Sequence, residues 1–211
     1  MTIIESPSER RFLRRLLAGN GSDSPAAVIL IGSSARGSST SPNSDVDLLV
    51  IGGEPPDHTP ARFQIMRLTP QELEERVGAG DDFAQWALRF GVPVSGRHLW
   101  SSLRDRLLPD APWPDPVMKL EQARTRADDA AALLDMGDLD AAQEQILLAL
   151  SHVGRAELLR RHVFPLTRPE MPEQLEAQGD GSLAAALRSV DGPPLGTEEL
   201  RGLLGLIHER C

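Results

Sequence analysis

The sequence has very little cysteine and very little lysine. Its single cysteine, Cys211, cannot form a disulfide within the chain, and this favours a reducing compartment. Its single lysine, Lys119, leaves arginine to supply nearly all of the positive charge, a bias typical of a GC-rich genome. The low cysteine content therefore excludes an internal disulfide framework.

Positive charge and long apolar runs are also scarce. The formal net charge is −9, whereas sequence-independent binding of nucleic acid needs a basic surface, so a long nucleic acid is not an expected partner. A nucleotide, or the end of a nucleic acid, could still bind in a locally positive cleft. No apolar run approaches the roughly 20 residues of a membrane span, and the N-terminus lacks the apolar stretch of a signal peptide. We therefore expect a cytoplasmic protein with no membrane partner.

The rest of the composition is that of a globular protein, and a proline-rich segment near the middle of the sequence separates two parts. Hydrophobic residues make up 40% and charged residues 25% of 211 residues. Four prolines within residues 109–116 interrupt any helix and form a stiff connector. The sequence therefore predicts one domain over 1–108 and a second over 117–211.

The first domain alternates between strand and helix patterns, whereas the second is helical throughout. In the first we expect helices over 7–19, 33–39 and 81–90, a capped helix from Thr69, strands over 26–32, 46–51 and 62–68, and an edge strand over 92–94. In the second we expect helices over 116–135, 138–163, 170–178, 182–190 and 197–209. The predicted fold class is an α/β domain followed by an all-α bundle.

Two aspartates open the second strand, in the run S-D-V-D-L-L-V of residues 44–50. Asp45 and Asp47 are two apart and point to the same face, while Val46 and Leu48 point into the core. Like charges so close are costly unless a cation lies between them. Because Mg²⁺ prefers one or two carboxylates plus water and phosphate oxygens, the pair predicts a site for Mg²⁺, or for Mn²⁺ in its place.

A loop rich in glycine and serine, G-S-S-A-R-G at residues 32–37, precedes these aspartates. Gly32 and Ser33 end the first strand and begin a short helix, so their backbone N–H groups can approach a phosphate closely. Arg36 adds positive charge, and Gly37 permits a tight turn out of the helix. The loop lacks the Gly-Lys-Ser/Thr ending of a Walker A motif and is not G-x-G-x-x-G. Together with the aspartates it predicts a site that handles phosphoryl groups.

The loop and the strand together resemble the signature of the DNA polymerase β-like nucleotidyltransferase superfamily, and especially its small prokaryotic members. The resemblance implies a short mixed sheet flanked by helices. It implies that Gly32 and Ser33 contact phosphate and that Asp45 and Asp47 are the catalytic, metal-binding residues. We expect the neighbouring Arg36, Gly37 and Ser44 to complete the nucleotide-binding residues. The expected activity is transfer of an NMP from an NTP, such as ATP, to a hydroxyl of a small molecule, a protein or an RNA end.

The C-terminal half resembles the helical domains that are fused to such transferases. The run F-P-L-T-R-P-E-M-P-E-Q-L at residues 164–175 carries this likeness, and four-helix bundles of the HEPN type are among these domains. The resemblance implies that this half selects the acceptor. A homodimer or a toxin-like partner protein would also fit.

One position departs from the pattern of active family members, which carry a third carboxylate on the next strand. The corresponding residue here is Gln64, whose neutral amide cannot act as a base and is a poor Mg²⁺ ligand. Asp57 or Glu54 in the preceding loop could substitute. The alternative is a nucleotide-binding regulator or antitoxin-like protein with weakened catalysis.

Two further signals have simple structural explanations. Arg155 and His162 have a spacing compatible with the ribonuclease motif of HEPN toxins, but cations also favour the C-terminal end of a helix. Trp86, Trp100 and Trp113 are expected to pack in the protein rather than to stack on bases.

Overall fold

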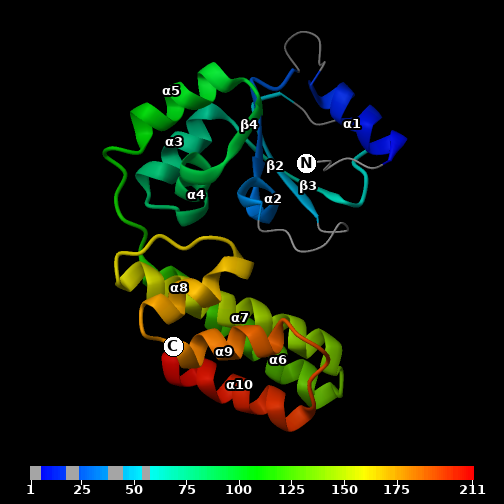
Figure 1. Ribbon diagram of the computed structural model, residues 1–211, viewed down its shortest axis with the longest axis vertical. Coiled ribbons are helices and arrows are strands. Elements are labelled where there is room, and N and C mark those ends of the chain that lie inside the picture. The colour runs from blue at the N-terminus through cyan, green and yellow to red at the C-terminus, as the bar shows by residue number, and fades with distance from the viewer. Residues whose placement is uncertain (1–5, 18–23, 38–44, 54–57) are drawn as a thin grey trace. The chain divides into compact units, whose positions relative to one another are not determined.

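The computed structural model describes residues 6–17, 24–37, 45–53 and 58–211. The chain forms two compact units, Met1–Pro114 and Asp115–Cys211 (Figure 1). Each unit has its own cluster of buried apolar side chains. The first contains a sheet flanked by helices, and the second is helical, so the predicted fold class is confirmed.

A four-stranded mixed sheet lies at the centre of the first unit. Its strands β1 (Ala27–Ile31), β2 (Val46–Ile51), β3 (Phe63–Leu68) and β4 (Val92–Ser95) lie in the order β3-β2-β1-β4. β1 is antiparallel to β2 and to β4, whereas β2 and β3 are parallel. Every residue of β1 is buried, as expected for an apolar strand with neighbours on both sides. The short helix α2 (Gly32–Arg36) follows β1 directly.

Helix α1 (Pro7–Leu17) covers one face of this sheet (Figure 1). Its side chains Phe12 and Leu16 are 4% and 1% exposed, and they pack with the alternate residues of β1 and β2 that face them. The rings of Phe12 and Phe63 lie 5.0 Å apart. The apolar stripe of α1 is therefore buried against the sheet, and its arginines remain outside.

Three helices lie on the side of the sheet opposite α1 (Figure 1). They are α3 (Pro70–Gly78), α4 (Asp82–Phe90) and α5 (Arg97–Leu107), of which α4 and α5 contact β1 while α3 contacts β3. The predicted capping box starts α3: the Glu72 N–H donates to Thr69 Oγ1 at 3.1 Å, and the Thr69 N–H donates to Glu72 Oε2 at 2.7 Å. These helices cover the apolar part of that face.

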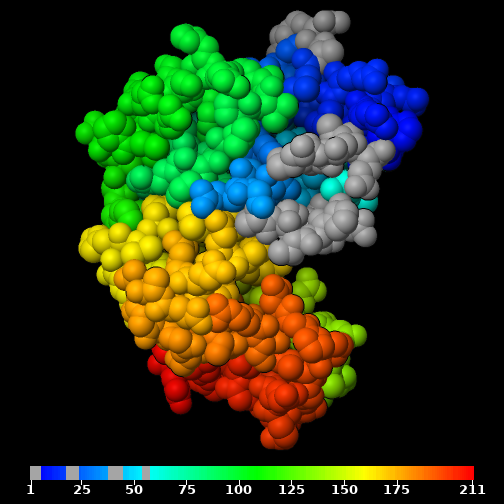
Figure 2. All heavy atoms as spheres, in the orientation of Figure 1, coloured from blue at the N-terminus to red at the C-terminus, as the bar shows by residue number. Residues whose placement is uncertain are grey.

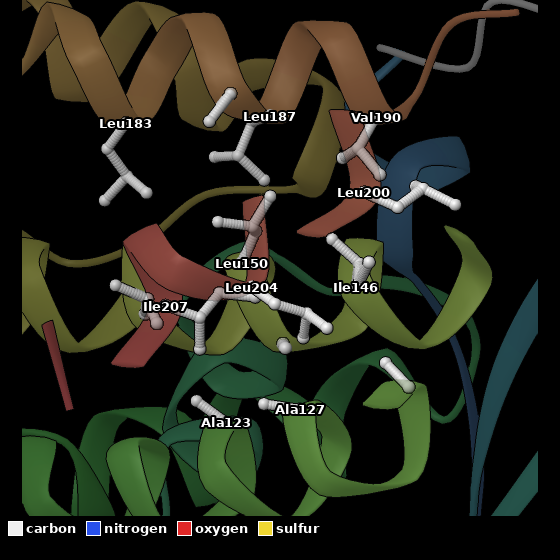
Figure 3. Close-up of a cluster of buried hydrophobic side chains, with 14 of the residues drawn as sticks. Ala123, Ala127, Ile146, Leu150, Leu183, Leu187, Val190, Leu200, Leu204 and Ile207 are labelled. Atoms are coloured by element: carbon white, nitrogen blue, oxygen red, sulfur yellow. The ribbon is translucent and has the colours of Figure 1, made fainter. Parts of the chain in front are cut away.

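The second unit packs its helices around a core of alanine, leucine, isoleucine and valine (Figure 3). Its helices are α6 (Pro116–Met136), α7 (Leu139–Arg160), the 3₁₀ turn Arg168–Glu170, α8 (Met171–Ala177), α9 (Gly181–Val190) and α10 (Thr197–Arg210). Small residues such as Ala123 and Ala127 are fully buried, and they let α6 lie close to α7. In the part of the chain that the structure describes, no helix is long and apolar enough to cross a membrane.

Most helices and strands agree closely with the expected ranges, and three differ. The short helix expected over 33–39 is α2, which begins at Gly32 and ends at Arg36, because Gly37 is left-handed. Helix α5 was not anticipated, although Trp100 and Leu103 lie three residues apart on its buried side. Helix α7 ends at Arg160 rather than near residue 163, because His162 adopts a left-handed φ of 56°. The N–H groups of His162 and Val163 then donate back to the carbonyls of Leu159 and Leu158, which closes the helix.

All three tryptophans of the protein lie in the first unit. Trp86 and Trp100 are 5% and 2% exposed, and Trp113 is 37% exposed. Packing is therefore the observed role of the first two, and the intrinsic fluorescence of the protein reports on the first unit.

Candidate functional site

Asp45 and Asp47 stand at the start of β2. Asp45 directly precedes the strand, and Asp47 is its second residue. The neighbours Val46 and Leu48 are each 2% exposed and belong to the core beneath α1. Because side chains alternate along a strand, the two carboxylates lie together on the opposite face, the side of the sheet where α3, α4 and α5 lie.

The surroundings of Asp47 change the ionisation of its carboxyl. Asp47 is half-buried, and burial raises the pKa of its carboxyl above the ordinary value; the negative charge of Asp45 raises it further. A cation between the two groups would act in the opposite direction, since positive charge favours the ionised form. The local electrostatics therefore suit a bound cation.

Gly32 brings the start of α2 against the aspartate pair. Its φ is 68°, and a Cβ at this position would overlap Oδ2 of Asp47. A residue with a side chain would strain the backbone and displace that carboxylate. The hydroxyl of Ser34 donates a long hydrogen bond, 3.5 Å, to the backbone carbonyl of Asp45. The Gly-Ser turn, which includes Ser33, and the aspartates thus meet at one point.

Arg36 and Gly37 form the other end of this short helix. The guanidinium of Arg36 lies 5.1 Å from the centre of the Phe90 ring, a cation–π contact with the end of α4. Gly37 has a φ of 70°, and its N–H donates to the carbonyl of Ser33, which ends α2. Arg36 is exposed, and its head group is oriented by an aromatic ring.

Gln64 lies directly beside the aspartates. The parallel register pairs Gln64 of β3 with Asp47 of β2, so both side chains lie on one face. The Gln64 amide donates a hydrogen bond of 2.9 Å from Nε2 to Oδ2 of Asp45. Gln64 therefore lies at the position where active family members are expected to carry the third carboxylate. It offers a hydrogen-bond donor to Asp45, whereas a carboxylate would offer an acceptor.

Three residues considered for the site lie outside the described residues: Ser44, Glu54 and Asp57. Among the residues that are described, no three histidine, cysteine, aspartate or glutamate side chains form a group that could hold a metal ion. Asp45 and Asp47 are therefore a pair in the described part of the protein.

Comparison with known proteins identifies the segment that carries this geometry. Residues 10–92, from α1 to the start of β4, match the family of nucleotidyltransferase domains. This segment is the part of the chain that resembles a nucleotidyltransferase domain. The crystal structure of a nucleotidyltransferase-like protein from Exiguobacterium sibiricum 255-15 is similar with 16% sequence identity and a TM-score of 0.47, over 95% of this chain and 72% of that one. No curated protein matches the chain.

The donors of the nucleotidyltransferase domain fit a hard divalent cation. Asp45 and Asp47 supply carboxylate oxygens on one face, and Gly32 leaves the space that Asp47 occupies. Mg²⁺ is commonly bound by one or two carboxylates, with its other positions filled by water and phosphate oxygens. Two carboxylates next to a Gly-Ser turn match that requirement.

Two side chains that contact the predicted site residues were not identified from the sequence. Ser34 contacts the backbone of Asp45, and its position next to Ser33 in the Gly-Ser loop was the only feature of the sequence that could have indicated this contact. Phe90 orients Arg36, but the two residues are far apart in sequence and only the fold brings them together.

Arg155 and His162 do not share a helix in the second unit. Arg155 is half-buried within α7, whereas His162 lies beyond the end of α7 in a left-handed conformation. The sequence spacing that suggested the ribonuclease alternative therefore does not place both residues on one helix.

Proposed function

We propose that the nucleotidyltransferase domain moves an NMP from an NTP, with ATP the first candidate, to a hydroxyl acceptor, and that Asp45 and Asp47 hold Mg²⁺ or Mn²⁺. The observation that carries this proposal is the packing of Gly32 against Asp47. This packing places a turn that can bind phosphates directly beside a carboxylate pair that can bind a metal. Transfer of nucleotides is also the activity for which the matching family is named.

Each residue has a defined role in this proposal. The backbone N–H groups of Gly32 and Ser33 would hold phosphate oxygens, and the guanidinium of Arg36, oriented by Phe90, would add positive charge. Gly37 would maintain the turn. Ser44, which lies outside the described residues, would add a nucleotide contact by resemblance alone. When bound, the divalent cation would neutralise charge on the phosphates and on the leaving group.

The transfer itself would make one bond and break one. The acceptor oxygen bonds to the α-phosphorus, the bond from that phosphorus to the bridging oxygen breaks, and pyrophosphate leaves. The acceptor proton passes to water, because the Gln64 amide cannot take it.

Nucleotide binding is tested by calorimetry of the full chain with Mg-ATP, Mg-CTP, Mg-GTP and Mg-UTP. Asp47→Asn should weaken binding at least tenfold, since it removes a charged ligand of the proposed metal. Asp110→Asn is the matched control, because it removes the same charge from an exposed position in the connector. If no nucleotide binds at millimolar concentration, the proposed function is wrong.

Nucleotidyl transfer is tested with ATP labelled at either the α- or the γ-phosphate, incubated with the protein, Mg²⁺ and a cell extract. Label from the α-position should enter an acceptor only when the protein is present. Label from the γ-position should enter no more than in extract without the protein, because the γ-phosphate leaves in pyrophosphate. Transfer of the γ-label by the purified chain would show a kinase and contradict the proposal. Loss of transfer in Asp47→Asn, with Asp110→Asn unaffected, assigns the activity to this site.

A second function, nucleotide binding without turnover, is favoured by one specific observation. The Gln64 amide donates to Asp45 at 2.9 Å and occupies one of the oxygens that would bind metal. In a regulator of this kind, the natural chain would bind Mg-NTP without transferring label. Gln64→Asp would then supply a carboxylate next to the pair and create measurable transfer. Transfer by the natural chain would exclude this alternative.

A further inference from the structure

Helix α1 carries four arginines on its outer surface. Its sequence, P-S-E-R-R-F-L-R-R-L-L, places Arg10 and Arg14, and Arg11 and Arg15, four residues apart. All four are exposed. Like charges at this spacing are neighbours on a helix and destabilise it, so the cluster is unfavourable for folding alone.

The ordinary structural explanations account for only part of this cluster. Arg14 and Arg15 lie in the last turn, where cations favour the helix dipole, but Arg10 and Arg11 lie nearer the N-terminal end, where they do not. Glu9 cannot neutralise the cluster: it is 8% exposed, accepts from the Ser6 N–H at 3.0 Å, and lies 3.7 Å from Arg62.

The four arginines surround a hollow at the surface. It has a volume of about 530 Å³, and the described residues that line it are Pro7, Arg10, Arg11, Arg14 and Arg15. Within the described residues, no ion pair involves Arg11, Arg14 or Arg15. Figure 2 shows α1, in deep blue, at the surface of the molecule. Four arginines against one glutamate give α1 a net charge of +3, in a protein whose net charge is −9.

The buried side of α1 narrows the choice of partner. A bilayer or a protein partner would need several apolar side chains at the centre of the contact. Phe12 and Leu16 are buried against the sheet, and α1 exposes one large apolar side chain, Leu17, at its end. Arginine binds phosphate through two parallel hydrogen bonds, and a row of such groups matches a chain of phosphates better than one phosphate. We propose that α1 binds the phosphodiester backbone of a short single-stranded nucleic acid.

Contacts of α1 connect this surface with the end of the sheet that carries the aspartates. Glu9 of α1 pairs with Arg62 at 3.7 Å, and the Arg62 carbonyl accepts from the Val46 N–H at 2.8 Å, between Asp45 and Asp47. The proposed binding surface does not depend on nucleotidyl transfer. Should the transfer also be confirmed, the bound strand would be a candidate acceptor.

The experiment measures binding of a fluorescent ten-nucleotide strand, one of RNA and one of DNA, by anisotropy between 50 and 200 mM salt. Neutralising three to four phosphates on a single strand predicts a slope of log K against log salt of roughly −2 to −3, which is a loss of about 20- to 50-fold over this range. The triple change Arg11→Gln, Arg14→Gln, Arg15→Gln leaves one arginine and should reduce the slope to about −0.7. Glutamine and arginine have similar helix propensities, so α1 should still form, and circular dichroism checks this.

The matched control neutralises three exposed arginines elsewhere: Arg76→Gln, Arg104→Gln and Arg201→Gln. It changes the net charge equally and should leave the slope unchanged. The triple change Arg11→Lys, Arg14→Lys, Arg15→Lys keeps the charge and should keep most of the slope, which separates the effect of lost charge from that of lost structure. The RNA and DNA strands show whether a ribose hydroxyl contributes. Equal loss in the control, absence of strand binding, or tighter binding to vesicles of acidic lipid would overturn the proposal.

Discussion

Replacing Gly32 by alanine should damage the candidate site far more than the same replacement at Gly37. Both glycines have left-handed backbones, with φ of 68° and 70°; Gly32 is the first residue of α2, and Gly37 is the cap that follows it. The backbone penalty for alanine is therefore similar at each, about 1–2 kcal/mol. The surroundings differ, because a Cβ at Gly32 would overlap Oδ2 of Asp47, whereas no atom lies within 4 Å of a Cβ at Gly37.

The overlapping atom is the terminal oxygen of the Asp47 side chain, which can rotate away, so the added cost is at the low end of overpacking, about 1 kcal/mol. We therefore expect Gly37→Ala to lower the free energy of unfolding by about 1–2 kcal/mol, and Gly32→Ala by about 2–3 kcal/mol. Urea unfolding followed by tryptophan fluorescence measures this, since all three tryptophans belong to the first unit. Binding of Mn²⁺, measured by calorimetry, should weaken at least tenfold in Gly32→Ala because Asp47 is displaced, and should be retained in Gly37→Ala.

Two results would refute this reasoning. If both variants lose the same stability, Asp47 does not press against Gly32 in solution. If Gly32→Ala binds Mn²⁺ as well as the natural chain, the position of Asp47 is not important for the metal.

The remaining predictions concern the stability of the two units. Arg210 donates to buried Asp180 at 2.6 Å and lowers the pKa of that carboxyl. The pair therefore stabilises the folded protein above the pKa of the unfolded carboxyl, about 3.9, and this stabilisation is lost as the pH falls below that value. Arg210→Gln should therefore cost about 1–3 kcal/mol at pH 7 and much less at pH 3, by circular dichroism. Gly202→Ala adds a Cβ in open space and should raise the free energy of unfolding by about 1 kcal/mol. Gly154→Ala would place a Cβ 2.6 Å from the sulfur of a buried methionine, and it should lower the free energy of unfolding by about 1 kcal/mol. Thr69→Ala removes the capping box and should cost about 1 kcal/mol by tryptophan fluorescence.

Each of these predictions has a control or a contradicting outcome. Arg201→Gln breaks an exposed pair with Glu198 and should change stability by less than about 0.5 kcal/mol. A pH-independent effect of Arg210→Gln would show that packing, not charge, is lost. A gain in stability from Gly154→Ala would show that α8 can shift away from α7. An unchanged Thr69→Ala would mean that water replaces the cap fully.

Local patterns were sufficient to predict most of the fold. The apolar run of β1 and the alternation of β3 indicated strands, and the capping box at Thr69 gave the start of α3 to the residue. The D-x-D spacing placed Asp45 and Asp47 on one face, because the two-residue period of a strand leaves no other choice.

Contacts between distant segments could not be read from such patterns. The cation–π contact of Arg36 with Phe90 depends on how α4 packs, and no local rule contains it. The hydrogen bond from Gln64 to Asp45 depends on the parallel register of β2 and β3. Helix α5 was missed because its charged residues obscure the short apolar repeat around Trp100. Contacts with the sheet and with α3 and α4 stabilise this helix.

The proline in β4 also affects how this sheet can meet other molecules. Val92 and Val94 are 46% and 47% exposed on a strand at the edge of the sheet, a combination that invites strand addition and aggregation. Pro93 lies between them and has no N–H to offer to an incoming strand. The edge therefore lacks a donor at its middle, and Pro93→Thr should turn β4 into a site of self-association without altering the aspartates at the start of β2.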